Sequence, residues 1–358
     1  MSEEFNEQSL IEESPLEQST LLPGLKSVCA RIGVMMIVVY ASRALCSILL
    51  ALFGANSLRG FQRTLVEVGS AMIFLNFIPM IAGIFIMRFS PKKRMGELYA
   101  KPRYFARSFG LFPAGYGLAI ACSFVTMLIG LLFRGTPIED SFAGVSGILT
   151  ADDPASMALR AFHTVIFAPI FEEFWFRGIV MHSLKPYGGG FAIFVSALLF
   201  GLTHANLGQF LYTTAIGIVL GYVAVQTGSI ITTTVMHAMF NAIGTVSSFL
   251  MNDEVQDYLS LLDMGYGPAP TSPVIVFFVW MVIVLLFAMV GFVMAIVKLA
   301  HIRRYRVPQM QTELSMGRRW GVFFSRPSVI IMLLMAFDTM TFIWVTRQLL
   351  DLIRNIFH

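Results

Sequence analysis

The sequence predicts an all-α fold: a polytopic membrane bundle of eight to nine transmembrane helices around a polar intramembrane cavity. Of its 358 residues, 56% are hydrophobic and only 13% are charged, whereas a soluble domain carries about 25% charged residues. Apolar stretches of roughly 20 residues, the length that crosses the hydrocarbon core of a bilayer, recur along the chain. The expected helices are 31–54, 65–88, 108–133, 154–184, 190–205, 208–226, 228–249, 273–299 and 327–350.

The first residues are acidic and offer little apolar surface to pack. They predict a disordered cytosolic tail over residues 1–23, followed by a single transmembrane domain over 24–358. No basic segment precedes an apolar core here, so we expect no cleaved signal peptide. The three cysteines are odd in number and widely spaced, which argues against a disulfide framework or a thiolate metal site.

The loops between the expected helices differ in charge. The loops 89–107 and 300–326 each contain six Lys or Arg residues and should face the cytosol. The loop 250–272 has four acidic residues and no basic one, and the loop 134–153 has four acidic residues and one arginine. Nine alternating spans satisfy all four loops, with the N-terminus in the cytosol. We therefore expect a multi-pass protein of the cell membrane.

The fourth expected helix contains the stretch Glu172-Glu173-Phe174-Trp175-Phe176-Arg177. Each charge at the centre of a membrane helix costs roughly 2.5 to 3.5 kcal/mol, so three charges cost on the order of 8 to 10 kcal/mol. Glu173 and Arg177 are four residues apart and can pair on one helix face. Glu172 is rotated by about 100° from its neighbour and is free to point elsewhere. The alternative is a salt bridge that only fixes helix packing.

Pro169 precedes this charged stretch by three residues. A proline inside a helix removes a backbone donor and commonly kinks the helix. We therefore expect the hydrogen-bond ladder to open near Val165.

Two further polar features follow within the apolar sequence. The fifth helix ends with His204, four residues after Phe200, and the seventh carries His237 and Asn241 on one face. Alone, each feature is more often a hydrogen-bonded core residue or a helix–helix clasp. Together with Glu172 they supply a base, an acid and an oxyanion clamp. With these helix bounds, His204 lies at the outer end of the fifth helix, whereas Glu172 lies toward the cytosol. The two side chains can meet if the fifth helix is too short to cross the bilayer.

These side chains suit amide hydrolysis without a serine or cysteine nucleophile. A carboxylate in an apolar site can act as a general base on water. His and Asn donors can stabilise an oxyanion, a role worth roughly 3 to 4 kcal/mol per donor. Ser196 and Ser229 have no obvious base beside them and are interpreted as packing and capping residues.

The motifs Glu-Glu-x-x-x-Arg, Phe-x-x-x-His and His-x-x-x-Asn, each on its own membrane helix, resemble the CPBP intramembrane proteases. This family is also called the type II CAAX prenyl endopeptidase or ABI family. The resemblance covers roughly residues 154–245, which would be the catalytic core, and implies an intramembrane glutamic endopeptidase. It implies that Glu172 activates water with His204, that His237 and Asn241 stabilise the oxyanion, that Glu173 and Arg177 form a supporting pair, and that Phe200 packs beside the site.

The resemblance implies a mechanism that needs no metal cofactor. Zinc remains an alternative because Glu and two His are acceptable ligands. It ranks lower because no HExxH motif is present and the ligands would come from three separate helices. A transporter ranks lower still, since no inverted repeat is visible in the sequence.

The implied partners are the lipid bilayer and a membrane-associated peptide or protein substrate, which the family name suggests is prenylated. The basic residues set membrane topology, and no nucleic acid partner is expected. The family also contains members tied to bacteriocin immunity or scaffolding, so the alternative function is a non-catalytic membrane protein of that kind.

Overall fold

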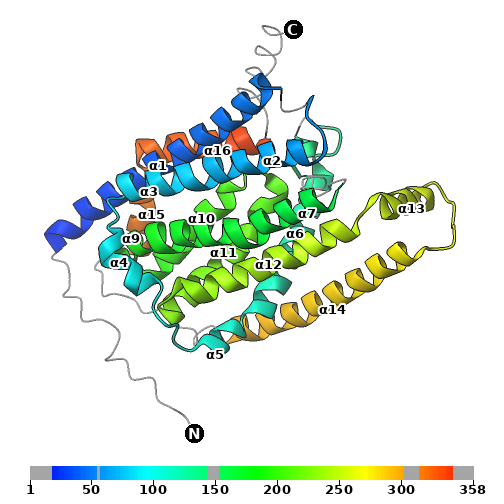
Figure 1. Cartoon of the computed structure of the whole chain (residues 1–358). Coiled ribbons are helices and arrows are strands. Elements are labelled where there is room, and N and C mark those ends of the chain that lie inside the picture. Colours follow the sequence, from blue (N-terminus) through cyan, green and yellow to red (C-terminus); the bar gives the residue numbers. More distant parts are fainter. Residues whose placement is uncertain (1–17, 55–56, 137, 143–152, 302–313, 342–358) are drawn as a thin grey trace.

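Helices make up the whole secondary structure of the described part of the chain, which confirms the all-α prediction (Figure 1). The structure is a computed structural model, and it describes residues 18–54, 57–136, 138–142, 153–301 and 314–341. The main helices are α1 (Gln18–Leu52), α2 (Gly60–Ala71), α3 (Ile78–Ile86), α4 (Pro91–Leu98), α5 (Phe105–Phe109), α6 (Phe112–Leu132), α7 (Pro154–Ala161), α8 (Ala168–Glu173), α9 (His182–Leu184), α10 (Gly189–Thr203), α11 (Leu207–Thr227), α12 (Ile230–Leu250), α13 (Asp253–Asp263), α14 (Ser272–Ala300), α15 (Met316–Phe324) and α16 (Pro327–Thr341).

Among the described residues, six helical runs are long and apolar enough to cross a membrane, and the chain is therefore a multi-pass membrane protein. They are Leu21–Leu52, Gly60–Ile86, Phe105–Leu132, Pro154–Tyr187, Leu207–Thr227 and Ser272–Ala300. The pair α15 and α16, bent by 73°, would make a seventh. The predicted count of eight to nine is not confirmed. One reason is that α10 has 15 residues and spans only about 22 Å at 1.5 Å per residue.

Helix α1 begins earlier than the sequence predicts. Residues 1–17 of the predicted tail lie outside the described residues, whereas residues 18–23 already belong to α1. Leu21 and Leu25 are buried, and so are Cys29 and Ile32 further along the helix. This apolar face gives the first turns of α1 a core to pack against, so they extend the helix instead of a disordered segment.

The helices are arranged in three layers (Figure 1). Helix α1 packs against α16 and α3 on one side of the molecule, and α6 packs against α14 on the other. Between them lie α10, α11 and the run from α7 to α9, with α11 in contact with both α10 and α6. The three helical segments that carry the sequence motifs thus lie in or beside the middle layer.

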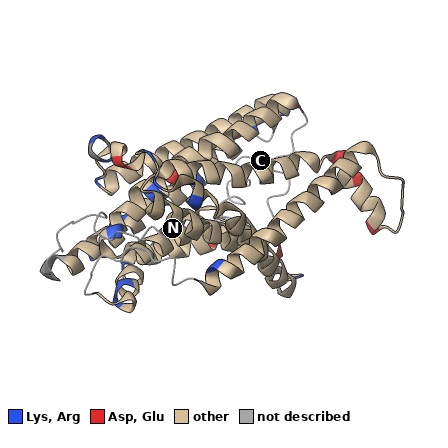
Figure 2. Ribbon diagram, turned by 90° about the horizontal axis from the view of Figure 1, so that it is seen from below, with Lys and Arg blue, Asp and Glu red and all other residues tan. Residues whose placement is uncertain are grey.

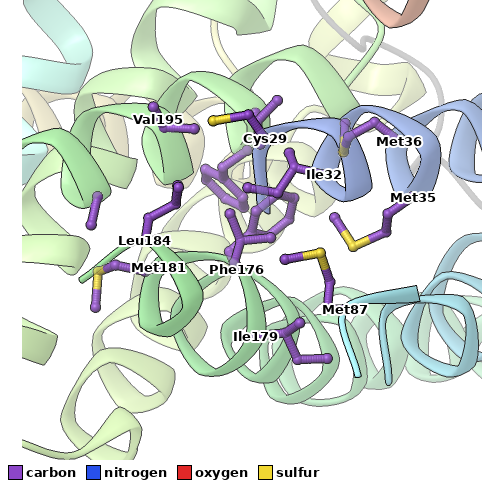
Figure 3. Packing of buried hydrophobic residues seen from close by; sticks show 14 of the residues in the cluster. Cys29, Ile32, Met35, Met36, Met87, Phe176, Ile179, Met181, Leu184 and Val195 are labelled. Atoms are coloured by element: carbon purple, nitrogen blue, oxygen red, sulfur yellow. The ribbon is translucent and has the colours of Figure 1, made fainter. Parts of the chain in front are cut away.

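The largest apolar cluster joins α1 to the middle layer (Figure 3). Phe176 and Ile179 are completely buried there against side chains of α1, among them Met35 and Met36. Trp175 donates its ring N–H to the sulfur of Met35 at 3.1 Å. This packing fixes the rotation of the segment that contains the charged motif.

In the described part of the chain, three segments have π-helical geometry, and two of them flank α8. They are η3 (Met72–Phe77), η5 (Phe162–Phe167) and η6 (Phe174–Met181). Segment η5 lies where Pro169 was predicted to open the ladder near Val165. At its end the Ala168 N–H donates to the carbonyl of His163, five residues earlier. Helix α8 and its two glutamates therefore lie between two π-helical turns. Turns of this kind are frequent at functional sites.

The charged residues separate toward opposite ends of the bundle (Figure 2). The acidic helix α13 lies at one end, and most Lys and Arg positions lie at the other, where α4, α5 and α15 are found. This separation has the sense that the loop charges predict. Which end faces the cytosol stays a prediction.

Candidate active site

The predicted ion pair between Glu173 and Arg177 is present inside the bundle. Nη1 of Arg177 donates to Oε1 of Glu173 at 2.6 Å, and neither side chain has accessible surface. Arg177 also donates to the carbonyl of Gly217 on α11 at 3.2 Å, and its guanidinium lies 4.8 Å from the ring centre of Phe200. This pair therefore links η6 to the two neighbouring helices.

Glu172 lies beside this pair but is not part of it. Its side chain keeps 26% of its surface accessible, whereas that of Glu173 is fully buried. Oε2 of Glu172 lies 3.7 Å from Nε2 of His237. The two adjacent carboxylates thus have different environments: that of Glu173 is enclosed, and that of Glu172 is partly accessible.

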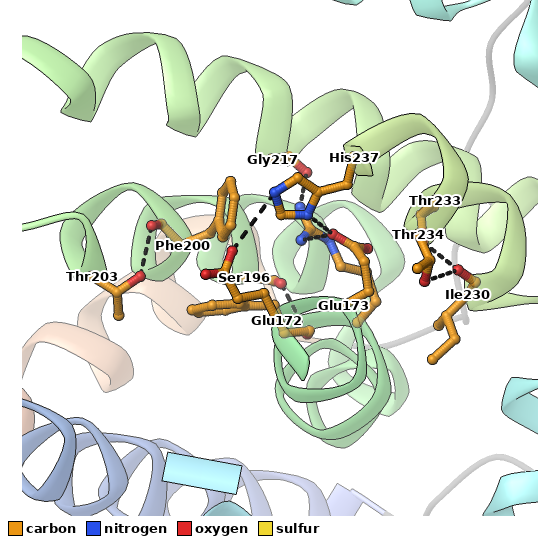
Figure 4. Close-up of polar contacts among 12 residues, drawn as sticks. Glu172, Glu173, Ser196, Phe200, Thr203, Gly217, Ile230, Thr233, Thr234 and His237 are labelled. Carbon is orange, nitrogen blue, oxygen red and sulfur yellow. Dashed lines mark hydrogen bonds and ion pairs between the residues drawn. The ribbon is translucent and has the colours of Figure 1, made fainter. Parts of the chain in front are cut away.

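His237 stands between the two glutamates (Figure 4). Its Nδ1 lies 2.9 Å from Oε1 of Glu173. Because that carboxylate is ionised by its pair with Arg177, it can only accept, so Nδ1 carries a proton and donates. The second ring nitrogen, Nε2, then faces Glu172. The order of contacts is Arg177, Glu173, His237, Glu172.

His204 follows the last residue of α10 and is partly exposed. Its Nδ1 lies 2.8 Å from the carbonyl oxygen of Phe200, which can only accept a hydrogen bond. In the neutral ring, Nε2 therefore holds a free lone pair. The Phe200 ring contacts both histidines, with centroid distances of 4.9 Å to His204 and 5.4 Å to His237. Helix α10 has 15 residues and is too short to cross a bilayer alone, which is the condition under which His204 and Glu172 can lie at one depth.

Two side chains of α1 that the sequence analysis missed close the end of α10. The Tyr40 hydroxyl donates to the carbonyl of Leu202 at 3.0 Å, and Arg43 donates to that of Thr203 at 3.2 Å. These carbonyls lie in the last turn of α10, where helical backbone donors run out. The Leu202 carbonyl also accepts from the N–H of Ala205 at 3.1 Å. Arg43 also interacts electrostatically with Glu172. The sequence did contain a signal for Arg43, because an arginine within an apolar span is a functional candidate by default.

Asn241 is placed differently from the other predicted site residues. Its side-chain Nδ2 donates to the backbone carbonyl of Thr164 in η5 at 2.7 Å. It shares a face of α12 with His237, as predicted from the spacing, but its recorded bond leads to the backbone before α8. The structure therefore brings Glu172 close to His237 and both histidines onto Phe200, while one N–H of the Asn241 amide is bonded to the backbone.

The serines interpreted as structural have structural contacts. The Ser196 hydroxyl donates to the carbonyl of Phe176, and the Ser229 hydroxyl accepts from the N–H of Ile231 at the start of α12. Both hydroxyls are buried and engaged with backbone. Neither contact provides the base that a nucleophilic serine needs.

The described residues contain no group of three or more His, Cys, Asp or Glu side chains placed to hold a metal ion. Both histidines use Nδ1 for protein acceptors, and Glu173 is occupied by Arg177. Histidines that bind zinc make Nδ1 bonds of the same kind, so independence of metal stays a prediction.

Fold and site together define a multi-pass membrane protein with a glutamate–histidine cluster inside its helical bundle. Residues 154–243 match the family described as Rce1-like, type II CAAX prenyl endopeptidase. The match covers about a quarter of the chain and includes every predicted site residue. It supports the CPBP/CAAX protease family, and with it a CAAX-type intramembrane protease in general. No curated protein and no solved structure matches the chain.

Proposed function

We propose that this protein is an intramembrane endopeptidase in which Glu172 activates the attacking water. The observation that carries the proposal is the convergence of Glu172 and two histidines inside the bundle, with Nε2 of His237 at 3.7 Å from the carboxylate. The Glu172 side chain is partly exposed, so a water molecule can reach it, whereas the Glu173 side chain is fully buried.

The first step is attack of water on the peptide carbonyl carbon. Glu172 accepts one proton of the water, and the free Nε2 of His204 accepts a hydrogen bond from the same molecule. A C–O bond forms, and the carbonyl electron pair moves to the oxygen. In the second step the C–N bond breaks, and Glu172 returns the proton to the leaving nitrogen. The products are a carboxylic acid and an amine.

His237 is proposed to stabilise the oxyanion of the intermediate. Its Nδ1–H is held by Glu173, which Arg177 keeps in place. In this role both ring nitrogens carry a proton, and the Nε2–H donates to the developing charge. Removing such a donor costs on the order of 100- to 1000-fold in kcat.

The proposed substrate is a membrane-associated peptide or protein. The site lies among helices that are long and apolar enough to cross a bilayer. Of the two adjacent glutamates, Glu172 is the one with accessible surface, and a substrate has to reach it inside this bundle. A prenylated peptide meets this requirement because its isoprenoid chain partitions into the membrane. Cleavage of matched peptides with and without the isoprenoid tests this part of the proposal.

The deciding experiment is a peptide-cleavage assay on purified protein, comparing wild type with Glu172→Gln. Turnover by wild type and its loss in the variant support the proposal. A folded wild type that cleaves neither prenylated nor unmodified peptides would instead favour the non-catalytic alternative, a membrane protein that acts in immunity or as a scaffold.

A further inference from the structure

The carbonyl of Thr164 has no donor within its own helix, in either register that the backbone could use. In an α-helix it would accept from the N–H of Ala168, but that group donates to His163, five residues earlier. In the π register its donor would be residue 169, which is proline and has no N–H. An orphan carbonyl inside the span Pro154–Tyr187 requires a donor from another element.

Asn241 is that donor, with 2.7 Å between its Nδ2 and the Thr164 oxygen. One turn earlier on α12, His237 donates to Glu173. The same face of α12 therefore holds the fourth span at two points, one before α8 and one at its end. Glu172 lies on the short segment between these two points.

We propose that Asn241 is a positioning residue, which satisfies the carbonyl that Pro169 leaves open and thereby fixes where α8 presents Glu172 to His237. Its catalytic consequence rests on the proposed function, whereas its structural consequence does not. This role uses the N–H that points at the Thr164 carbonyl and is separate from the oxyanion role that the sequence resemblance implies, since the amide has a second N–H.

Loss of the amide would remove the support for the π-helical turn before α8. A π-helical turn holds one residue more than an α-helical turn, so its collapse rotates the following residues by about 100°. Such a rotation would carry Glu172 away from Nε2 of His237. The structure thus connects a side chain on α12 to the direction of the proposed base without contact between the two.

The test is a double-mutant cycle with Asn241→Leu and Pro169→Ala in the full-length protein. Leucine has a similar volume and no donor, and the alanine supplies the N–H that Pro169 lacks. When residue 169 is the native proline, we expect Asn241→Leu to lower kcat about tenfold or more, with KM changed by less than about threefold. In the Pro169→Ala background the loss should shrink to about threefold or less.

Two further measurements keep the test independent of catalysis. The same cycle is read from thermal unfolding in detergent, where Asn241→Leu should lower Tm only when Pro169 is present. Amide hydrogen exchange over residues 163–173 should rise in Asn241→Leu. Thr234→Val is the matched control, because the Thr234 hydroxyl bonds only within α12, to Ile230 at 2.8 Å, and should leave exchange over residues 163–173 unchanged.

Each outcome decides the proposal. Equal losses of kcat or of Tm in both backgrounds, with unchanged exchange over residues 163–173, would overturn it. Of these results, an equal loss of kcat with no loss of Tm would favour direct oxyanion donation by Asn241. If Asn241→Leu does not fold, Asn241→Gln keeps a donor and should retain both yield and low exchange. If wild type shows no peptidase activity, the proposed function fails, while the unfolding cycle and the exchange data still accept or reject the positioning role.

Discussion

At the scale of single residues, Glu172 and Glu173 are chain neighbours with opposite surroundings. Glu173 is enclosed and bonded to both Arg177 and His237, whereas Glu172 keeps 26% of its side chain accessible. The i,i+4 spacing was sufficient to predict the Glu173–Arg177 pair, because it depends only on local helix geometry. The partner of Glu173 on α12 depends on tertiary packing, and sequence spacing contains no such information.

Glu173→Gln should therefore lower the yield of folded protein. Breaking a buried pair leaves Arg177 as an uncompensated charge, at a cost of about 3–5 kcal/mol. Glu172→Gln should keep wild-type yield and unfolding temperature and lose turnover. Size-exclusion chromatography in detergent and the peptide assay measure both effects. If the two variants behave alike in yield and turnover, the proposed division of roles is wrong.

The response to chelators distinguishes direct activation of water from activation by zinc. If Glu172 and His204 activate water directly, turnover should survive exhaustive chelation and dialysis. If zinc held the water, chelation should abolish turnover and added zinc should restore it. Metal analysis of the active protein completes the test: stoichiometric zinc that is lost together with activity would reject the proposed mechanism.

At the scale of secondary-structure elements, the end of α10 determines the position of His204. Its last carbonyls accept from Tyr40 and Arg43 of α1, and the His204 ring bonds back to Phe200. The sequence analysis left open that the fifth helix is too short to cross the bilayer, and α10 has 15 residues. It did not predict these caps, because they join positions about 160 residues apart.

Arg43→Gln should reduce kcat/KM about tenfold, since the partly buried Thr203 carbonyl loses its donor, at a cost of up to roughly 1–3 kcal/mol, and the helix end becomes free to shift. Arg31→Gln is the matched control on the same helix, because Arg31 bonds only locally, to Ser27 at 2.8 Å. Steady-state kinetics of both variants, normalised to folded protein, provide the measurement. An equal effect of the two substitutions would indicate a general loss of charge on α1.

At the scale of the whole molecule, the middle layer holds the site and the outer layers hold the middle layer in place. Composition alone predicted a membrane bundle, since the hydrophobic stretches are long and the charges few. The number of spans could not be predicted in the same way. Helix α10 is apolar but short, and α12 carries the polar residues of the site, so neither satisfies a simple criterion of length and hydropathy.

The contact between α6 and α14 offers a test of this division between site and support. A Cβ added to Gly291 of α14 would overlap the carbonyl oxygen of Pro113 and lie 2.8 Å from its carbon, so the two backbones could not approach as closely. Gly291→Ala should therefore lower the stability by about 1–3 kcal/mol, the usual cost of overpacking. Gly244→Ala, on α12, is the control because nothing lies within 4 Å of the added atom.

Turnover per folded molecule should stay unchanged in Gly291→Ala, because this contact lies between α6 and α14 and involves none of the proposed catalytic side chains. Thermal unfolding in detergent and the peptide assay on the folded fraction separate the two effects. A variant that unfolds at the wild-type temperature would contradict the close α6–α14 contact. A folded variant that has lost turnover would show that the outer layer sets the geometry of Glu172 and the two histidines as well as supporting it.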